Sequence, residues 1–325
     1  WTVILTLIAG VVLAQVILPA GHGLRAATGG SVTPWLVLLG AAAIIALYRS
    51  GLGALRRRAE HKEPAVPENP ETFASGELDR YVRHVVLREL GGPGQKKLKQ
   101  ARVLVIGAGG LGSPALLYLA AAGVGVIGVI DDDVVDTGNL QRQVIHRDAD
   151  IGVAKVFSAE KAMKALNPYL VVKPYKRRLT DDIAHDLIAE YDIILDGTDN
   201  FETRYLVNKA CVAQGKPLVS GALSQWEGQI SVFQPSVAGP CYQCVFPEAP
   251  PAGLAPSCAE AGVLGPLPGV VGSMMAVETV KWITGAGAVL RGEMLIYDAL
   301  WGETRKFALS RRPECQTCGQ DGGPT

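Results

Sequence analysis

Gly107-Ala108-Gly109-Gly110-Leu111-Gly112 is the stretch of sequence that decides the fold. An apolar run, residues 102–107, leads into it, and an amphipathic stretch, residues 112–122, follows it. It therefore joins a predicted strand to a predicted helix. Glycines at this spacing let the backbone approach a phosphate, and the N-terminus of a helix attracts negative charge. Asp131 ends the next predicted strand, where a carboxylate can accept ribose hydroxyls. These residues predict a nucleotide-binding site. At this point in the sequence, such a site would also fit a dehydrogenase.

Short apolar runs alternate with longer amphipathic stretches from about residue 77 onward. This alternation predicts an α/β fold with a doubly wound, Rossmann-like parallel sheet. After residue 221 the runs become shorter and surround one more helix near residues 269–282, which predicts an antiparallel extension of the same sheet. The expected strands are residues 102–107, 126–131, 170–175, 193–196, 218–221, 229–233, 293–297 and 305–309, and the other expected helices are 112–122, 153–166, 181–190 and 202–213.

Polar side chains that suit a triphosphate follow several of these strands. They are Asn139-Leu140-Gln141-Arg142-Gln143, Lys155 and Asp196-Gly197-Thr198-Asp199-Asn200. Loops after successive parallel strands gather beyond the carboxyl ends of the sheet, so these residues can meet over one ligand. Arg142 and Lys155 would offset phosphate charge, and Asp199 suits Mg²⁺. Taken singly, the two cations also fit solvated surface charges, and Asp199 or Asn200 also fits a helix N-cap.

Four of the six cysteines form two Cys-x-x-Cys pairs about 70 residues apart: Cys241, Cys244, Cys315 and Cys318. This pattern predicts a tetrahedral Zn²⁺ site with four thiolate ligands. Such a site has no open coordination position, so its expected role is to pin the antiparallel extension to the sheet. A pair of disulfides would require an oxidising compartment.

The first 50 residues differ from the rest in composition. Residues 1–18 and 32–48 carry no charged side chain, and they predict a hairpin of two transmembrane helices in which the first is the stronger span. Arg49, Arg56, Arg57, Arg58 and Lys62 follow the second span, so the positive-inside rule places the remainder of the chain in the cytoplasm. A cleaved secretory signal, or two buried helices of a soluble domain, would also produce these runs. Residues 51–77 read as a basic, Pro-rich linker.

The overall charge excludes one class of partner. Lysine plus arginine number 31 and aspartate plus glutamate also number 31 in 325 residues. No global positive charge is present to hold a polyanion by counterion release, so we expect no nucleic-acid partner.

Seven motifs together resemble a known family. Arg80-Tyr81-x-Arg83, the glycine-rich loop, residues 139–143, Lys155, Asp196-x-x-Asp199-Asn200 and the two cysteine pairs occur in unbroken order between about residues 78 and 319. They resemble the HesA/MoeB/ThiF family of adenylyltransferases, which activate ubiquitin-like sulfur carriers, and within it most closely the molybdopterin-synthase adenylyltransferases. The resemblance implies an adenylyltransferase domain over residues 78–320 and does not extend to residues 1–75.

The resemblance also implies a reaction and its partners. ATP with Mg²⁺ would adenylate the C-terminal glycine of a small ubiquitin-like sulfur carrier ending in Gly-Gly, the small subunit of molybdopterin synthase, for molybdenum cofactor biosynthesis. The arginine matching Arg83 reaches the neighbouring subunit's site, which implies a homodimer. Cys258 stands where relatives keep a nucleophilic cysteine, or it has no catalytic duty in this branch. The residues that the family assigns to the nucleotide are Gly107, Gly109, Gly110, Gly112, Asp131, Gly138, Asn139, Leu140, Gln141, Arg142, Lys155, Asp199 and Asn200.

Other functions remain open at this level. The thiamine-pathway sulfur carrier would undergo the same reaction. From different classes, a nicotinamide-dependent oxidoreductase on the same fold, or a non-catalytic membrane platform that binds nucleotide, would also fit the nucleotide loop and the apolar N-terminus.

Overall fold

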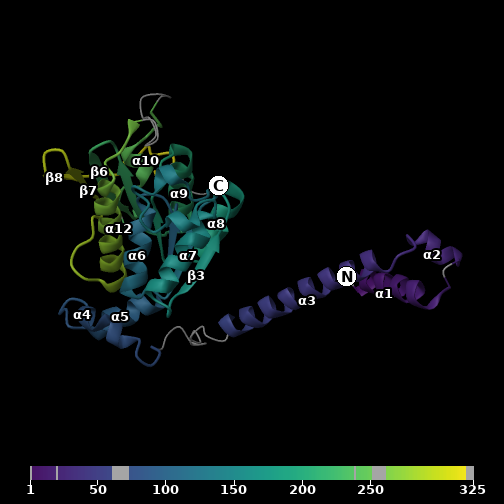
Figure 1. Ribbon diagram of the computed structural model, residues 1–325. Helices are drawn as coiled ribbons and strands as arrows, with labels where there is room; N and C mark the ends of the chain where they lie inside the picture. The colour runs from purple at the N-terminus through teal and green to yellow at the C-terminus, as the bar shows by residue number, and fades with distance from the viewer. Residues whose placement is uncertain (1, 20, 61–72, 238, 251–260, 320–325) are drawn as a thin grey trace. The chain divides into compact units, whose positions relative to one another are not determined.

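The computed structural model describes residues 2–19, 21–60, 73–237, 239–250 and 261–319 of the chain (Figure 1). The chain divides into two units, Trp1–Pro64 and Ala65–Thr325. The first contains only helices, and the second contains the sheet and the helices that cover it.

The N-terminal unit consists of α1 (Thr2–Ile17), α2 (Gly23–Ala27) and α3 (Thr33–Glu60), with α1 packed against α3. Hydrogen bonds fasten the turn between them. The buried Gln15 amide donates to the carbonyl of Arg25 at 3.0 Å and to Thr28 Oγ1 at 2.6 Å. Trp35 Nε1 donates to the carbonyl of Thr28 at 2.9 Å. The two apolar runs therefore form a helical hairpin.

The described residues do not support a hairpin that crosses a membrane twice. α1, as described, has 16 residues. Among the described residues, one helical stretch is long and apolar enough to cross, Thr33–Gly51 in α3, with 19 residues and a mean hydropathy of 1.4. The predicted hairpin of two transmembrane helices is therefore not supported, and the one candidate span lies in the second apolar run, which was predicted to be the weaker.

The second unit is built on one eight-stranded sheet in the order β3-β2-β1-β4-β5-β6-β7-β8. β1 to β5 are parallel, and β6, β7 and β8 continue the sheet in antiparallel pairing. The predicted Rossmann-like sheet with an antiparallel extension is confirmed. The strands are β1 (Arg102–Ile106), β2 (Val126–Ile130), β3 (Val171–Tyr175), β4 (Ile193–Asp196), β5 (Leu218–Leu223), β6 (Glu227–Phe233), β7 (Glu293–Asp298) and β8 (Glu303–Ala308).

Helices cover both faces of this sheet because its parallel strands are apolar on both sides (Figure 1). Along β1, Val103 and Val105 enter one core and Leu104 and Ile106 enter the other. The first core is closed by α5 (Gly91–Gln100), α6 (Gly112–Ala122), α7 (Lys155–Leu166) and α12 (Pro266–Thr284), and the second by α8 (Asp181–Ala189) and α9 (Phe201–Ala213).

The strand order reverses between β1 and β4. From β1 the chain proceeds outward through β2 to β3, and then returns to place β4 on the opposite side of β1. The loops that follow β1 and β4 therefore turn away from each other at the carboxyl edge of the sheet. A doubly wound sheet forms its ligand crevice at such a point.

A buried ion pair fastens the beginning of the globular unit. Lys99 Nζ lies 2.7 Å from Glu77 Oε1, and the two side chains are 3% and 0% exposed. Lys99 Nζ also donates to the carbonyl of Tyr169 at 3.1 Å, and Glu77 Oε2 accepts from the backbone N–H of Ala74 at 2.9 Å. The pair thus joins residues 74–77, at the beginning of this unit, to α5 and to the turn before β3.

Replacing Lys99 with methionine is expected to lower the free energy of unfolding by about 3–5 kcal/mol, because the Glu77 carboxylate is left buried without its partner. Urea unfolding of the full chain measures this. The double variant Lys99→Met/Glu77→Gln should recover most of the loss. Lys209→Met, which breaks the exposed pair with Asp181, should change the midpoint little. Equal effects for Lys99→Met and Lys209→Met would contradict the prediction.

Candidate functional site

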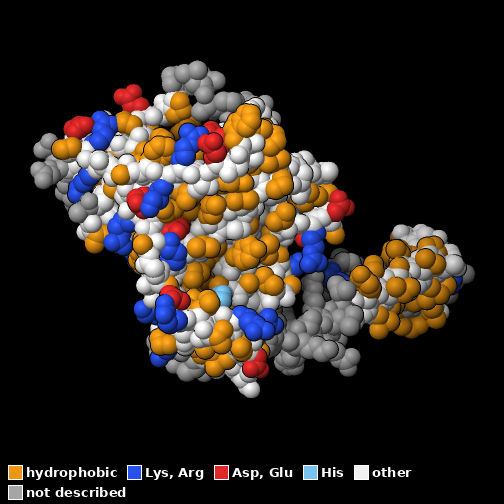
Figure 2. Space-filling model, turned by 90° about the vertical axis from the view of Figure 1, so that its left-hand side faces the viewer, with side chains coloured by type: hydrophobic (Ala, Val, Ile, Leu, Met, Phe, Trp, Pro, Cys, Tyr) orange, Lys and Arg blue, Asp and Glu red, His pale blue; other side chains and the backbone are white. Residues whose placement is uncertain are grey.

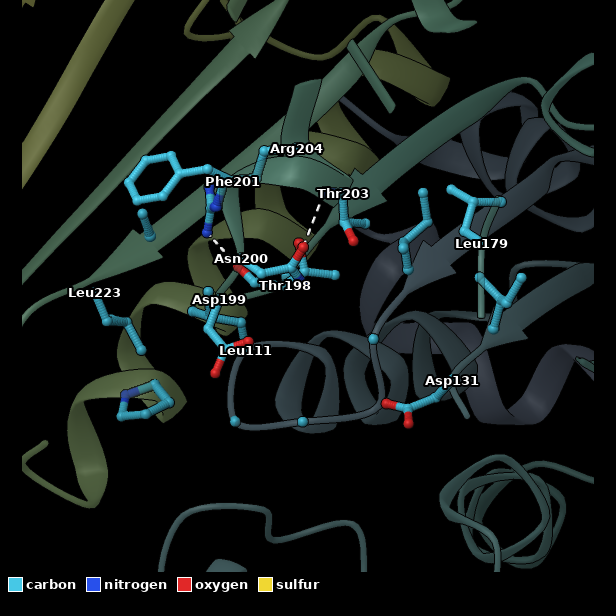
Figure 3. A pocket seen from close by; sticks show the side chains of 18 of the residues that line it. Leu111, Asp131, Leu179, Thr198, Asp199, Asn200, Phe201, Thr203, Arg204 and Leu223 are labelled. Atoms are coloured by element: carbon cyan, nitrogen blue, oxygen red, sulfur yellow. Dashed lines mark hydrogen bonds between the residues drawn. The ribbon is translucent and has the colours of Figure 1, made fainter. Parts of the chain in front are cut away.

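A pocket of about 810 Å³ lies where the strand order reverses, at the carboxyl ends of β1, β2 and β4 (Figure 3). Its wall combines backbone from the glycine-rich loop with charged and apolar side chains. The predicted site residues among its lining are Gly107, Gly109, Gly110, Asp131, Arg142, Lys155, Asp199 and Asn200. The structure therefore brings together residues that lie up to about 90 positions apart in the chain.

The glycine-rich loop turns sharply from β1 into α6. Gly107 has a φ of +92°, a conformation that glycine adopts readily. A Cβ on Gly112 would lie 1.9 Å from the carbonyl oxygen of Gly107, so this position has no room for a side chain. Gly112 therefore shapes the turn from within and does not line the pocket.

Asp131 lies beside this loop at the end of β2. Its Oδ2 accepts from the backbone N–H of Ala108 at 2.8 Å, and its Oδ1 accepts from the N–H of Asp133 at 2.9 Å. Burial raises the pKa of the Asp131 carboxyl above its usual range, against these hydrogen bonds, which lower it. One carboxylate thus connects the loop after β1 with the loop after β2.

Arg142 reaches the pocket from the turn after β2, and its guanidinium is held from behind. One terminal nitrogen donates to the carbonyl of Gly138 at 3.1 Å, and the other donates to Asn139 Oδ1 at 3.0 Å. Gly138 and Asn139 therefore support Arg142 and do not line the pocket themselves. Leu140 and Gln141, which were also predicted to bind the nucleotide, lie outside the lining.

Lys155 is the first residue of α7, and its side chain is 6% exposed. Its Nζ lies 2.8 Å from Oδ2 of the exposed Asp133. The amine is therefore fixed at the pocket wall by a carboxylate that solvent also reaches. Arg142 and Lys155 are therefore not freely moving surface charges. Gly138 and Asn139 hold the first, and Asp133 holds the second.

Asp199 and Asn200 follow β4 on the opposite side of the pocket (Figure 3). Asn200 is the N-cap of α9, because its side chain accepts from the N–H of Thr203 at 2.8 Å. Asp199 is exposed, and within the described residues its carboxylate makes no hydrogen bond or ion pair. A metal-binding role for Asp199 stays a prediction. A second group of carboxylates, Asp131 to Asp133, has its oxygens within 4.8 Å of one another at the same pocket.

Arg204 is a pocket residue that the sequence analysis missed. Its side chain is buried and donates to the carbonyl of Gly221 at 2.8 Å and to the carbonyl of Thr198 (Figure 3). It thus connects the loop after β4 with β5. The helical spacing indicates that this side chain is buried, because Arg204 stands on the same face of α9 as the buried Val207 and Cys211. Gln143, Arg177 and Arg178 also line the pocket.

The four predicted zinc ligands form one buried cluster. Their sulfur atoms lie within 4.8 Å of one another, with contacts of 3.8 Å from Cys241 to Cys244, 3.6 Å from Cys241 to Cys315 and 3.4 Å from Cys244 to Cys318. A tetrahedral Zn²⁺ with metal–sulfur bonds of about 2.3 Å requires sulfur separations near 3.8 Å, so the cluster fits the ion. These contacts are too long for disulfide bonds.

The cluster joins distant parts of the chain beside the pocket. Cys241 and Cys244 belong to the turn that forms α10 (Tyr242–Val245), and Asn208 of α9 holds this turn by accepting from the N–H of Tyr242 at 2.8 Å. Tyr242 lines the pocket. A metal here would therefore have a structural role, connecting the extension of the sheet to the pocket wall.

Two predicted residues do not join the pocket. Arg83 lies in the short helix α4 (Val82–Val85), is exposed, and is not among the lining residues. Cys258 lies outside the described residues. Neither predicted role is tested by the pocket.

Comparison with known proteins shows which family this arrangement belongs to. The model of the ThiF family matches residues 81–317, which is more than half of the chain. The chain belongs to the ThiF family. The sulfur carrier protein adenylyltransferase of Thermus thermophilus is 51% identical to this ThiF-family chain over 249 residues, covering 75% of the chain and 92% of that protein.

Two longer relatives match the same part of this ThiF-family protein. The probable adenylyltransferase/sulfurtransferase MoeZ of Mycobacterium tuberculosis is 52% identical over 253 residues, covering 77% of the chain and 64% of MoeZ. The adenylyltransferase and sulfurtransferase MOCS3 of Sus scrofa is 47% identical over 266 residues, covering 81% of the chain and 58% of MOCS3. The chain thus spans less than two thirds of either protein. The predicted enzyme class, an adenylyltransferase, is confirmed by these relatives.

Solved structures that are less than 25% identical to this chain show the same fold. The crystal structure of E. coli MccB with ATP superimposes with a TM-score of 0.65 at 23% identity, covering 78% of this chain and 77% of that one. The structure of PaaA has a TM-score of 0.64 at 20% identity, covering 81% and 82%. At these identities the likeness supports the fold and carries no statement about substrates.

Proposed function

We propose that this protein uses Mg·ATP to adenylate the C-terminal glycine carboxylate of a small ubiquitin-like sulfur carrier, releasing pyrophosphate. The observation that carries the proposal is the pocket at the strand-order reversal, where Arg142 and Lys155 face the same cavity as the exposed Asp199 carboxylate. One relative that is about half identical is named a sulfur carrier protein adenylyltransferase, and two others are named adenylyltransferases and sulfurtransferases, which supports the same conclusion.

The reaction requires two anions to meet. Two like charges about 4 Å apart repel by roughly 4 kcal/mol at an effective dielectric constant of 20, and ATP brings further charges. Arg142 is held by Gly138 and Asn139, and Lys155 is held at the pocket wall by Asp133, so both can stabilise phosphate charge without prior rearrangement. Bound Mg²⁺ would supply further positive charge to the phosphates, with Asp199 as its protein ligand.

The remaining groups position the reactants. Asp131 presents a carboxylate at the end of β2, where a ribose would lie beside the glycine-rich loop. No general base is required, because the carrier's terminal carboxylate is already ionised at neutral pH. The four-cysteine cluster would hold Zn²⁺ through Cys241, Cys244, Cys315 and Cys318 and would stabilise the wall that carries Tyr242.

We propose the small subunit of molybdopterin synthase as the carrier, with molybdenum cofactor biosynthesis as the pathway. The motif spacing resembles that branch of the family most closely. The thiamine-pathway carrier is the alternative, and the experiment below separates the two.

A homodimer with shared sites is part of the proposal, with Arg83 of each subunit reaching the other's pocket. Exposed apolar side chains surround Arg83 on α4 and continue over the neighbouring helices. They include Val82 and Val85 of α4, Tyr118 of α6, and Val270 and Val277 of α12. Figure 2 shows hydrophobic side chains gathered over this side of the globular unit. An apolar face of this kind supports burial against a second copy.

Attachment to a membrane through Thr33–Gly51 of α3 is likewise proposed. The stretch has the length and hydropathy of a single span. Arg49 lies near the end of this stretch and the run Arg56-Arg57-Arg58 follows it, and by the positive-inside rule we propose that the adenylyltransferase unit is cytoplasmic.

The test is ATP–pyrophosphate exchange with purified candidate carriers. We expect exchange only when a carrier ending in Gly-Gly is present, faster with the molybdopterin-synthase subunit than with the thiamine-pathway carrier, and absent when the last glycine is removed. Faster exchange with the thiamine carrier would reassign the pathway. ATP binding without exchange with either carrier would favour a non-catalytic platform, and hydride transfer to a nicotinamide would favour an oxidoreductase.

A further inference from the structure

A buried row of polar side chains runs from the glycine-rich loop to α7, and none of its members has a place in the chemistry described above. His146, 6% exposed, has its Nε2 2.9 Å from the carbonyl oxygen of Ala108 and its Nδ1 2.9 Å from Ser158 Oγ. Ser158 Oγ lies 3.1 Å from Asp150 Oδ2, and Lys161 Nζ lies 2.9 Å from Asp150 Oδ1.

The hydrogen-bonding capacities of these groups fix the role of His146 Nε2. A carbonyl oxygen can only accept, so Nε2 must carry a hydrogen and donate it to Ala108. The single Ser158 hydroxyl hydrogen goes either to Nδ1 of a neutral ring or to Asp150 when the ring is charged. In both arrangements the bond from Nε2 to Ala108 is kept.

Burial lowers the pKa of His146 and so favours the neutral ring. The hydrogen bond to Ala108 and the carboxylates of Asp131 and Asp150 act in the opposite direction, and the nearby Lys155 lowers the pKa further. The hydrogen bond from Lys161 lowers the pKa of the Asp150 carboxyl. Asp150 therefore stays ionised in its ion pair with Lys161 and does not take a proton from His146.

The contact with Ala108 determines where the next amide points. The carbonyl of Ala108 and the N–H of Gly109 belong to one planar trans peptide, so the two bonds point in opposite directions. His146 holds the carbonyl on the buried side, and Gly109 lines the pocket. The N–H of Ala108 is held separately by Asp131. Within the described residues the N–H of Gly109 donates no hydrogen bond.

We propose that His146 is a positioning residue that, through the carbonyl of Ala108, aims the N–H of Gly109 at a phosphate oxygen of the bound nucleotide. The inference rests on the proposed function, because it requires a nucleotide in this pocket. It assigns to a buried histidine an effect on phosphate recognition without contact with the ligand. Ser158 is its anchor, because it holds the second ring nitrogen.

The phosphate contribution to binding is the quantity that tests this role. The dissociation constants of Mg·ATP and of adenosine are measured by calorimetry for the wild-type chain, His146→Phe and His146→Gln. Phenylalanine keeps a ring and removes the donor, whereas the glutamine amide can still donate to Ala108. For His146→Phe we expect Mg·ATP to bind roughly 10-fold more weakly, the loss of about one hydrogen bond to a charged group, with adenosine unchanged. His146→Gln should restore most of the affinity for Mg·ATP.

Two further variants keep the result interpretable. His185→Phe changes an exposed histidine on α8, outside the pocket lining, and should leave both constants unchanged. Ser158→Ala removes the anchor and leaves His146 in place, so it should weaken Mg·ATP by a smaller factor, and it serves as the test if His146→Phe does not fold.

The possible failures are distinguishable. If the wild-type chain does not bind Mg·ATP, the proposed function fails and this inference fails with it. If the wild type binds and His146→Phe keeps the full difference between Mg·ATP and adenosine, only the positioning role is overturned. Equal weakening of adenosine and Mg·ATP would show a general structural role and would also overturn it.

Discussion

Asp199→Ala is expected to reduce carrier-dependent ATP–pyrophosphate exchange by roughly 1,000-fold, a loss of about 4 kcal/mol of transition-state stabilisation. The proposed reason is the loss of the protein ligand that places Mg²⁺ on the phosphates. Asp199 is exposed, and its carboxylate makes no hydrogen bond with the described residues, so the fold does not depend on it. Exchange rate, melting temperature and zinc content are measured on the same preparation, and only the first should change.

Asp182→Ala is the matched control for this variant. Asp182 is an exposed carboxylate in the first turn of α8, and it lies outside the pocket lining. Its loss removes the same charge near the N-terminus of a neighbouring helix and should leave exchange close to the wild-type rate. If Asp199→Ala retained exchange, the metal would have to be held elsewhere, and the neighbouring Asp131 to Asp133 carboxylates would be the next group to examine.

Cys315→Ser is expected to abolish stoichiometric zinc binding and to lower the free energy of unfolding by at least about 5 kcal/mol. A structural zinc site contributes its binding free energy to folding, and that amount is a large part of the stability of an ordinary domain. The Cys315 sulfur lies 3.6 Å from that of Cys241, 74 residues away, so its loss releases the end of the sheet extension. Metal content by atomic absorption and urea unfolding measure the two effects.

Cys211→Ala provides the control for the cysteine variant. Cys211 lies on the buried face of α9 and outside the cluster. The Cys211→Ala variant should therefore keep one zinc per chain and should lose only the packing of one small side chain. Stripping the wild-type chain with a chelator should reproduce the effect of Cys315→Ser and should not reproduce that of Cys211→Ala. A zinc-free wild-type chain of full stability would refute the metal assignment.

The sheet could be predicted from the sequence because its parallel strands are buried on both faces. Such strands are short continuous apolar runs, as in Arg102–Ile106 and Val126–Ile130, separated by helices with one apolar face. The position of the pocket followed in part from the same pattern, because Asp131 and the segment from Asp196 to Asn200 stand where strands end. Asp131 and Asp199 could thus be placed at one edge without knowledge of the strand order.

Other features depended on contacts that a linear pattern does not contain. Arg204 was not predicted: its spacing places it on the buried face of α9, but only the packing of that helix shows that its guanidinium meets backbone carbonyls. Asn139 was expected to touch the ligand, whereas it supports Arg142. The two apolar N-terminal runs are helices as expected, but among the described residues only the stretch Thr33–Gly51 has the length and hydropathy of a span, which apolar composition alone did not decide.

The wide separation of the two cysteine pairs has a consequence for how the protein matures. During synthesis, Cys241 and Cys244 leave the ribosome well before Cys315 and Cys318, and the strands β7 and β8 lie between them. A complete set of four thiolates therefore exists only after those strands have been made, so metal capture is a late step that closes a large loop. A shortage of zinc in the cell would accordingly leave chains with a finished parallel sheet and an unsecured edge, a form that quality-control proteases can recognise.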